Sequence, residues 1–203
     1  MRRLIGSQRA AGAWGIAFVV LLLVSAAMVS LPTAAESGER IAAFYSAHGQ
    51  VITVQQVVGI VALAAFIAFA LSLPPNRWLR LALWAFVVSE LVTNVVPLII
   101  VATKPAPDAA HSLTLVEDLA DSALFLSVAL FVVAATLTQP RWLRAASYLV
   151  AAACGIRAVA SPFGIAALDQ VAPLIFVAFV LVLSIKLLVR PTAEVRLSAT
   201  TDE

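Results

Sequence analysis

Ionisable and amide side chains interrupt long apolar stretches of the sequence, and these are the residues that could do chemistry. They are Gln55, Gln56, Glu90, Asn94, Glu117, Asp118, Asp121 and Arg157. An ionised group at the centre of a bilayer costs about 2.5–3.5 kcal/mol on insertion scales, so each needs a partner or a function. Several carboxyl groups beside one arginine favour proton transfer or the binding of a polar group.

Charge and depth suggest a role for each residue. Glu90 lies deepest in its apolar stretch, and we expect it to be a neutral acid that donates a proton or a hydrogen bond. Asp118 and Asp121 are the other catalytic candidates. The candidates for binding a ligand are Gln55, Gln56, Asn94, Glu117 and Arg157, with Trp84 as an aromatic wall.

Two structural alternatives stay open at this point. Arg157 and one carboxylate would also be satisfied as an ion pair that only holds helices together. Glu117 and Asp118 would also suit the first turn of a helix, where the helix dipole favours negative charge and water is near.

The string Glu117-Asp118-Leu119-Ala120-Asp121 resembles the acidic motif with which prenyl-diphosphate enzymes hold magnesium. Carboxylates at positions i, i+1 and i+4 of a helix can share a hard cation such as Mg²⁺. Glu117 departs from the usual Asp, however, and no second acidic motif completes the site, so no cofactor is predicted. His48 and His111 are expected at one rim, as ordinary interfacial histidines rather than as metal ligands or pH sensors.

Membrane-spanning helices must position these residues. Of the 203 residues, 63% are hydrophobic and 12% charged, and the mean hydropathy is +1.03. A soluble domain carries about 25% charged residues, so lipid must be the solvent here. Apolar stretches near the roughly 20 residues that cross a bilayer occupy about 13–31, 51–73, 81–103, 114–138, 145–165 and 170–189. Because lipid offers no hydrogen bonds to the backbone, we expect one all-α domain of six spans over residues 1–203.

The basic residues predict the orientation of the six spans. Of the 13 basic residues, those expected on one side are Arg2, Arg3, Arg9, Arg77, Arg80, Arg141, Arg144, Lys186, Arg190 and Arg196. Only Arg40 and Lys104 fall on the other side. The positive-inside rule therefore places both termini in the cytoplasm, and a bacterial cytoplasmic membrane is the expected location.

With that orientation, the polar side chains of spans 2 to 5 lie at one level in the outer half of the membrane. Glu90 and Asn94 are four residues apart and share a helix face, as do Glu117 and Asp121. We expect one polar pocket that opens towards the outer side, whereas the inner halves of the same spans are almost wholly apolar.

The segment between spans 1 and 2 carries a further helical pattern. Ile41, Phe44, Tyr45 and His48 follow a helical period, and Ser37 is a suitable N-cap with Glu39 in the first turn. We expect an interfacial helix over about 37–48. The first span also has features of a signal peptide, including the small residues that follow Pro32. An uncleaved span is favoured because the apolar stretch is longer than is usual for a signal peptide.

A faint internal repeat links two turns of the chain. Pro75-Asn76-Arg77-Trp78-Leu79-Arg80 is echoed by Pro140-Arg141-Trp142-Leu143-Arg144. A shift of nearly the same length takes His48 to His111 and Gln55 to Asp118. A parallel duplication of a two-helix hairpin would explain the repeat, as would convergence on a good cytoplasmic turn.

The order of these features resembles a group of small bacterial membrane proteins with no established function. The likeness rests on the segment 39–48, the turn 139–143 and the end of the last span, 184–191. It implies six helices and nothing about chemistry. A weaker analogy is to membrane-integral terpene cyclases, which use carboxylic acids among lipid-embedded helices. Glu90 or Asp121 would be the acid, and Phe66, Phe69, Trp84 and Phe125 would be aromatic walls for a carbocation.

Three functions are compatible with the sequence. The first is an outer-leaflet carboxylate and arginine site for a lipophilic or amphipathic molecule, with cyclisation or isomerisation as the enzymatic form. The second is a proton-coupled transporter. The third is a non-catalytic accessory subunit that pairs with another membrane protein. The bilayer is a partner in all three, and the net charge of +2 gives no indication of nucleic-acid binding.

Overall fold

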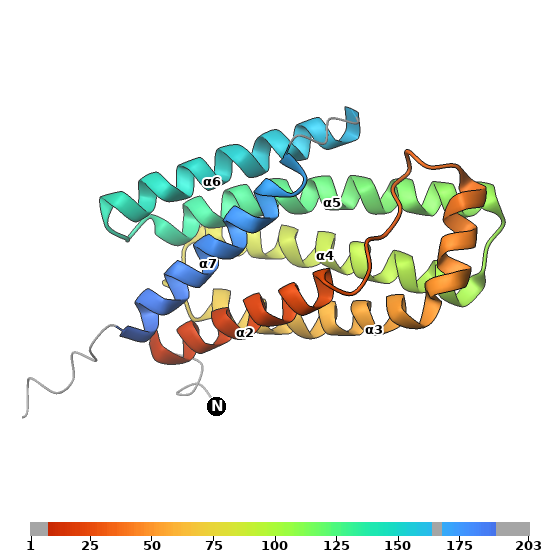
Figure 1. Ribbon diagram of the computed structural model, residues 1–203. Coiled ribbons are helices and arrows are strands. Elements are labelled where there is room, and N and C mark those ends of the chain that lie inside the picture. Colours follow the sequence, from red (N-terminus) through yellow and green to blue (C-terminus); the bar gives the residue numbers. More distant parts are fainter. Residues whose placement is uncertain (1–7, 164–167, 190–203) are drawn as a thin grey trace, which may run out of the picture.

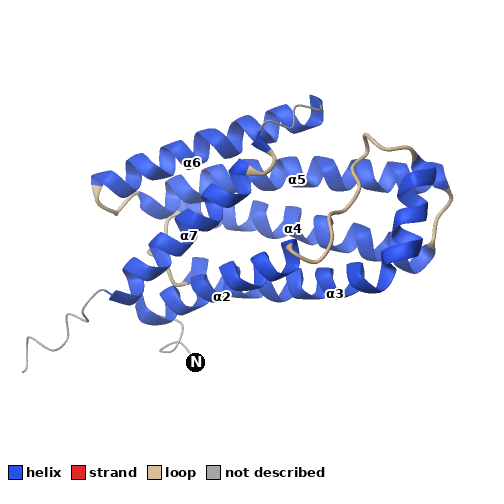
Figure 2. Cartoon of the chain, in the orientation of Figure 1, coloured by secondary structure: helices blue, strands red, loops and turns tan. Residues whose placement is uncertain are grey.

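The computed structural model describes residues 8–163 and 168–189, and throughout these ranges the regular structure is helical (Figures 1 and 2). The helices are α2 (Gln8–Ala26), α3 (Gly38–Leu71), α4 (Arg77–Thr103), α5 (Pro107–Thr136), α6 (Arg141–Ala160) and α7 (Val171–Val189), with a 3₁₀ turn, η1 (Ser161–Phe163), after α6. All six helices are long and apolar enough to cross a membrane. The prediction of an all-helical chain with six long apolar helices is confirmed, and this is the make-up of a multi-pass membrane protein.

Successive helices pack side by side from α2 to α6, and α7 returns to pack mainly against α2 (Figure 1). We call the end with the α3–α4 and α5–α6 turns the inner end and the opposite end the outer end. Helix α3 has 34 residues, so it is about 50 Å long. That exceeds the roughly 30 Å of a hydrocarbon core, and the outer parts of α3, α4 and α5 extend beyond the ends of α2, α6 and α7 (Figure 1).

The predicted interfacial helix and the second span form one continuous helix, α3. Ser37 is its N-cap and accepts a hydrogen bond from the backbone N–H of Arg40, as its sequence suggested. The first turns of α3 lie across the outer end of the bundle, at an angle to the rest of the helix (Figure 1). The predicted break between the interfacial helix and the second span is absent, because Gly49 alone is not enough to end a helix.

Helix α5 also begins earlier than predicted, at Pro107 rather than near residue 114. Proline suits the first position of a helix because its missing N–H would have no partner there. Glu117 and Asp118 consequently lie about three turns into α5. The alternative that they are first-turn residues is therefore wrong, and Asp108 has that place.

The inner half of the bundle is held by a large apolar core that centres on phenylalanine rings. Phe66 is fully buried, and its ring centroid lies 4.2 Å from that of Phe86, 4.8 Å from that of Phe131 and 4.9 Å from that of Phe18. Helix α2 contributes Phe18 and also packs closely on α7, where Gly15 leaves room for the hydroxyl group of Ser184. Small residues allow helices to approach each other in this way.

A second and smaller apolar core lies at the outer end, under the first turns of α3. Its buried members are Ile41, Tyr45, Ile52, Val96, Ile100 and Ala110. Between the two cores lies a band of polar side chains, which we call the polar belt. Its members are Gln55, Gln56, Ser89, Glu90, Asn94, Glu117, Asp118, Asp121, Ser122, Arg157 and Asp169.

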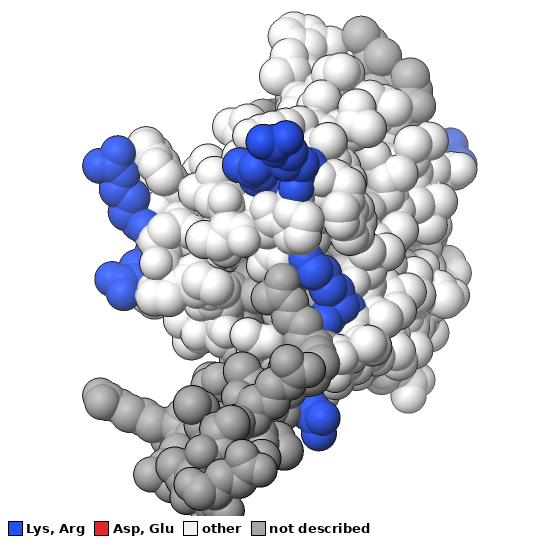
Figure 3. Space-filling model, turned by 90° about the vertical axis from the view of Figure 1, so that its left-hand side faces the viewer, with Lys and Arg blue, Asp and Glu red and all other residues white. Residues whose placement is uncertain are grey.

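The inner end of the molecule is basic. The face drawn in Figure 3 carries Lys and Arg side chains and shows no Asp or Glu. The described basic residues of this end are Arg9, Arg77, Arg80, Arg141, Arg144 and Lys186. The predicted contributions of Arg2, Arg3, Arg190 and Arg196 lie outside the described residues, as does the end of the fifth predicted span.

Candidate functional site

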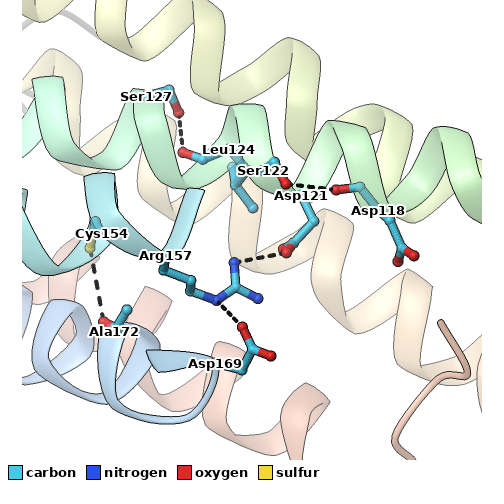
Figure 4. A network of polar contacts seen from close by, with 9 residues as sticks. All are labelled: Asp118, Asp121, Ser122, Leu124, Ser127, Cys154, Arg157, Asp169 and Ala172. Atoms are coloured by element: carbon cyan, nitrogen blue, oxygen red, sulfur yellow. Dashed lines mark hydrogen bonds and ion pairs between the residues drawn. The ribbon is translucent and has the colours of Figure 1, made fainter. Parts of the chain in front are cut away.

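Arg157 is the central cation of the polar belt and contacts two carboxylates (Figure 4). Its Nη1 lies 2.8 Å from Oδ2 of Asp121 on α5, and its Nε lies 3.4 Å from Oδ1 of Asp169, just before α7. The guanidinium group also lies over the ring of Phe125, 3.7 Å from the ring centroid, which is an attractive cation–π geometry. Only 11% of the Arg157 side chain is exposed.

Local structure explains the position of Arg157. It lies in the last turn of α6, where the negative end of the helix dipole favours a cation. The sequence predicts Arg157 and Asp121 as site residues but does not predict Asp169. The available signal was that Asp169 precedes the last span, on the same predicted side as the other acids.

Glu90 is held by its neighbour one turn along α4. The amide Nδ2 of Asn94 donates to Oε1 of Glu90 at 3.1 Å and to the Glu90 backbone carbonyl at 2.7 Å. The other side of the Asn94 amide lies against Gly59 on α3, where a Cβ would collide with Asn94 Oδ1. The expected pairing of these residues on one helix face is therefore present, and Gly59 fixes the amide in place.

Glu90 and Arg157 are not direct partners. Helices α4 and α6 both pack against α5. Asp121 on α5 binds Arg157, and α5 also packs against α4, which carries Glu90. The acidic and basic candidates therefore lie on three adjacent helices, with Asp121 on the middle one.

The three acids that α5 contributes to the polar belt point to three different partners. Glu117 Oε2 accepts a hydrogen bond from the hydroxyl of Tyr45 at 3.3 Å, and Asp118 Oδ2 accepts one from the backbone N–H of Ala34 at 2.8 Å. Asp121 binds Arg157. In the described part of the chain no group of three or more His, Cys, Asp or Glu is arranged to hold a metal ion. The suggestion of Mg²⁺ at Glu117, Asp118 and Asp121 is thus not supported, because their carboxylates diverge.

The two histidines make hydrogen bonds to different backbone carbonyl groups. His111 Nε2 makes a hydrogen bond with the carbonyl oxygen of Ala34, on the connection that precedes α3. His48 Nδ1 makes one with the carbonyl oxygen of Phe44 and stacks on the Phe44 ring. Each histidine therefore has a local structural role.

Gln55 connects α3 to the end of α2. Its Nε2 donates to the carbonyl oxygens of Ser25 and Val29, at 3.1 and 2.9 Å, and Ser25 Oγ donates to the Gln55 carbonyl. Carbonyl groups at the end of a helix lack partners within it, so Gln55 satisfies groups that lipid could not. This contact gives Gln55 a structural role, although its Oε1 is buried without a hydrogen-bond partner.

Trp84 does not lie with the polar belt. It is 68% exposed on the surface of the bundle, in the first turns of α4. Phe66 and Phe69 are fully buried within the inner core. Of the four suggested aromatic walls, only Phe125 contacts a belt residue, through Arg157. Gln56 is buried in α3 between the two apolar cores.

A small pocket of about 130 Å³ lies between the outer ends of α3 and α4. It is lined by Ala42, Tyr45, Ser46, Ile100, Val101, Lys104 and Pro105. Since a water molecule occupies about 30 Å³ in the liquid, a few waters would fill it. Tyr45 connects this pocket to Glu117, whereas the expected open pocket around Glu90 and Arg157 has its polar groups paired with one another.

Comparisons with models of protein families, with curated proteins and with solved structures find no match to this chain. The resemblance to small bacterial membrane proteins therefore stays a prediction. The geometry alone indicates what the site can do. It places five carboxyl groups and one guanidinium group within one band of the bundle, where protons can be exchanged and a polar group can be bound.

Proposed function

We propose that the polar belt is an acid–base site for a lipophilic or amphipathic molecule in the outer half of a bacterial cytoplasmic membrane. The observation that carries the proposal is that Glu90, Asp121 and Arg157 lie on three adjacent helices, with Asp121 bound to Arg157. The belt holds five carboxyl groups, of which only two contact its guanidinium group, and such an excess of acids is not needed to hold a helical bundle together. The inner core shows that these helices also pack without any charge.

The basic inner end supports an orientation with both termini in the cytoplasm. Among the described residues, the face in Figure 3 shows Lys and Arg but no Asp or Glu, and cytoplasmic ends of membrane proteins carry an excess of Lys and Arg. A duplicated hairpin is supported by the parallel course of α3 and α5, in which Phe66 and Phe131 lie side by side.

Glu90 and Asp121 have complementary surroundings for acid–base chemistry. Glu90 has a neutral amide as its hydrogen-bond partner and is the proton donor of the proposal. Asp121 forms an ion pair with Arg157 and is the proton acceptor of the proposal. In an isomerisation, Glu90 would transfer a proton to a carbon–carbon double bond and leave a carbocation. Asp121 would then remove a proton from a neighbouring carbon, and return of that proton from Asp121 to Glu90 completes the cycle.

The two alternative functions have less support. A proton-coupled transporter needs a polar path to the cytoplasm, but the phenylalanine core fills the inner half of the bundle. An accessory subunit that pairs through its charges needs charges that face outwards. Here Arg157, Glu117 and Asp118 are all paired within the chain.

Lipid extracts of cells that make the wild-type protein or a variant test the proposed function. We expect Glu90→Gln and Asp121→Asn to change the abundance of at least one lipid-soluble metabolite, with its precursor accumulating. Asp108→Asn is the matched control, because Asp108 is exposed in the first turn of α5 and lies outside the belt. Extracts that are identical for wild type, Glu90→Gln and Asp121→Asn would exclude the enzymatic function.

A further inference from the structure

The two turns at the inner end have similar sequences but different surroundings. The α3–α4 turn carries Arg77 and Arg80, and the guanidinium group of Arg77 lies over the ring of its own neighbour Trp78, 4.7 Å from the centroid. The α5–α6 turn carries Arg141 and Arg144 in the matching positions. The two turns therefore provide a natural comparison within one chain.

The α5–α6 turn gains a third cation from a distant part of the sequence. Lys186, near the end of α7, donates from Nζ to Oε1 of Gln139 at 2.7 Å. The same ammonium group lies 5.7 Å from the ring centroid of Trp142, which is itself largely exposed. Lys186 thus joins Arg141 and Arg144 at this turn, whereas no described basic residue from a distant part of the chain is seen to contact the α3–α4 turn.

The surroundings of this cluster are those of a membrane–water interface. The described residues that Figure 3 shows on the inner face include Lys and Arg side chains but no Asp or Glu. Tryptophan is enriched at the level of lipid headgroups. Below the turn, Leu149 on α6 and Ile185 on α7 are exposed and apolar, as acyl chains require.

We propose that the α5–α6 turn and Lys186 form a binding site for the phosphate of an anionic phospholipid. Arginine binds phosphate oxygens through two parallel N–H groups, and lysine adds a point charge. The site is separate from the polar belt and does not depend on the function proposed there.

Binding of dioleoylphosphatidylglycerol to the purified full-length protein in detergent tests the site, with dioleoylphosphatidylcholine as the neutral lipid. Native mass spectrometry measures the bound lipid. We expect the wild type to bind the anionic lipid about tenfold more tightly than the neutral one, because basic residues near a membrane surface attract anionic headgroups. The double variant Arg141→Gln/Arg144→Gln should lose most of this preference.

The matched control is Arg77→Gln/Arg80→Gln, which removes the same charge from the similar turn. It should keep most of the preference. Equal losses in both double variants would assign the effect to general charge and overturn the site, as would a wild type that binds both lipids equally. If the first double variant does not fold, Arg141→Gln and Arg77→Gln alone make the same comparison, because both side chains are exposed.

Two further measurements test whether the bound phosphate belongs to a lipid and whether the site is independent of the polar belt. Inorganic phosphate should not displace the lipid, because it lacks the acyl chains that contact α6 and α7. Displacement at equal concentration would overturn a lipid site. Glu90→Gln should leave lipid binding at the wild-type level, and a loss there would contradict the separation of the two sites.

Discussion

The inner and outer halves of this bundle are held together by different forces. In the inner half, rings from α2, α3, α4, α5 and α7 interlock around Phe66. In the outer half, α3 binds α2 through Gln55, and α5 binds α6 through Asp121 and Arg157. The contrast teaches that charge is not required for packing in this chain, so the belt is the region to examine for function.

The energetic difference between the halves follows from the solvent. Lipid is as apolar as a phenylalanine side chain, so the inner helices associate through close packing rather than through release of water. The belt carries a cost of burial that its ion pair and hydrogen bonds offset only in part. Each of the following changes tests one side of this contrast, from the largest expected effect to the smallest.

Phe66→Ala tests the inner half and should have the largest effect on stability. The side chain is fully buried and its ring contacts those of five other phenylalanines, so its removal leaves a cavity. We expect the free energy of unfolding to fall by about 4 kcal/mol, as measured by titration with a denaturing detergent. Trp84→Ala is the control on the lipid-facing surface. Equal losses for both would show that the inner core is not the main source of stability.

Arg157→Met tests the ion pairs of the outer half. The change leaves Asp121 and Asp169 without their cation, and breaking a buried pair costs about 3–5 kcal/mol. We expect a loss of about 3 kcal/mol, because 32% of the Asp121 side chain stays exposed. Arg40→Met removes an exposed pair with Glu36 and should change stability by less than about 0.5 kcal/mol. If Arg157→Met lowers the free energy of unfolding by no more than Arg40→Met does, the belt does not hold α5 and α6 together.

Gly59→Ala tests how tightly Asn94 is placed beside Glu90. The new methyl group would collide with Asn94 Oδ1, and overpacking of this kind costs about 1–3 kcal/mol. We expect a loss of about 1.5 kcal/mol in the same titration. Gly155→Ala on α6 meets no atom within 4 Å and should stabilise the helix by about 0.5–1 kcal/mol. If Gly59→Ala unfolds with the same free energy as the wild type, the Asn94 amide has room to move.

Gln55→Met tests the hydrogen bonds between α2 and α3 at nearly constant volume. Hydrogen bonds between membrane helices contribute about 0.6 kcal/mol on average, and two are lost here. We expect a loss of about 1 kcal/mol, with faster hydrogen exchange at the end of α2. An unchanged exchange rate would show that the carbonyl groups of Ser25 and Val29 do not depend on Gln55.

Local patterns in the sequence predicted the parts of the fold that depend on neighbours along the chain. The six apolar helices, the Ser37 N-cap and the pairing of Glu90 with Asn94 are of this kind. Periodicity and spacing within one helix are enough to specify them. The merging of the interfacial helix into α3 was missed, because continuity depends on the packing of Ile41 and Tyr45 against α4 and α5.

Contacts between helices were much harder to predict. The outward position of Trp84 and the binding of Tyr45 to Glu117 depend on how each helix is rotated about its axis. Sequence periodicity is almost uniform in helices that are apolar all round, so it does not specify that rotation. Asp169 was missed for a related reason, since its contact with Arg157 depends on how the chain returns from α6 to α7.

The most direct test of the central claim is to measure stability and lipid chemistry together for Glu90→Gln. Glutamine keeps the oxygen that accepts from Asn94 Nδ2, so we expect the free energy of unfolding to stay within about 1 kcal/mol of wild type. The lipid extract should nevertheless change as it does when the protein is absent. A variant with wild-type lipids and a large loss of stability would show that Glu90 only holds the bundle together, and would contradict the account.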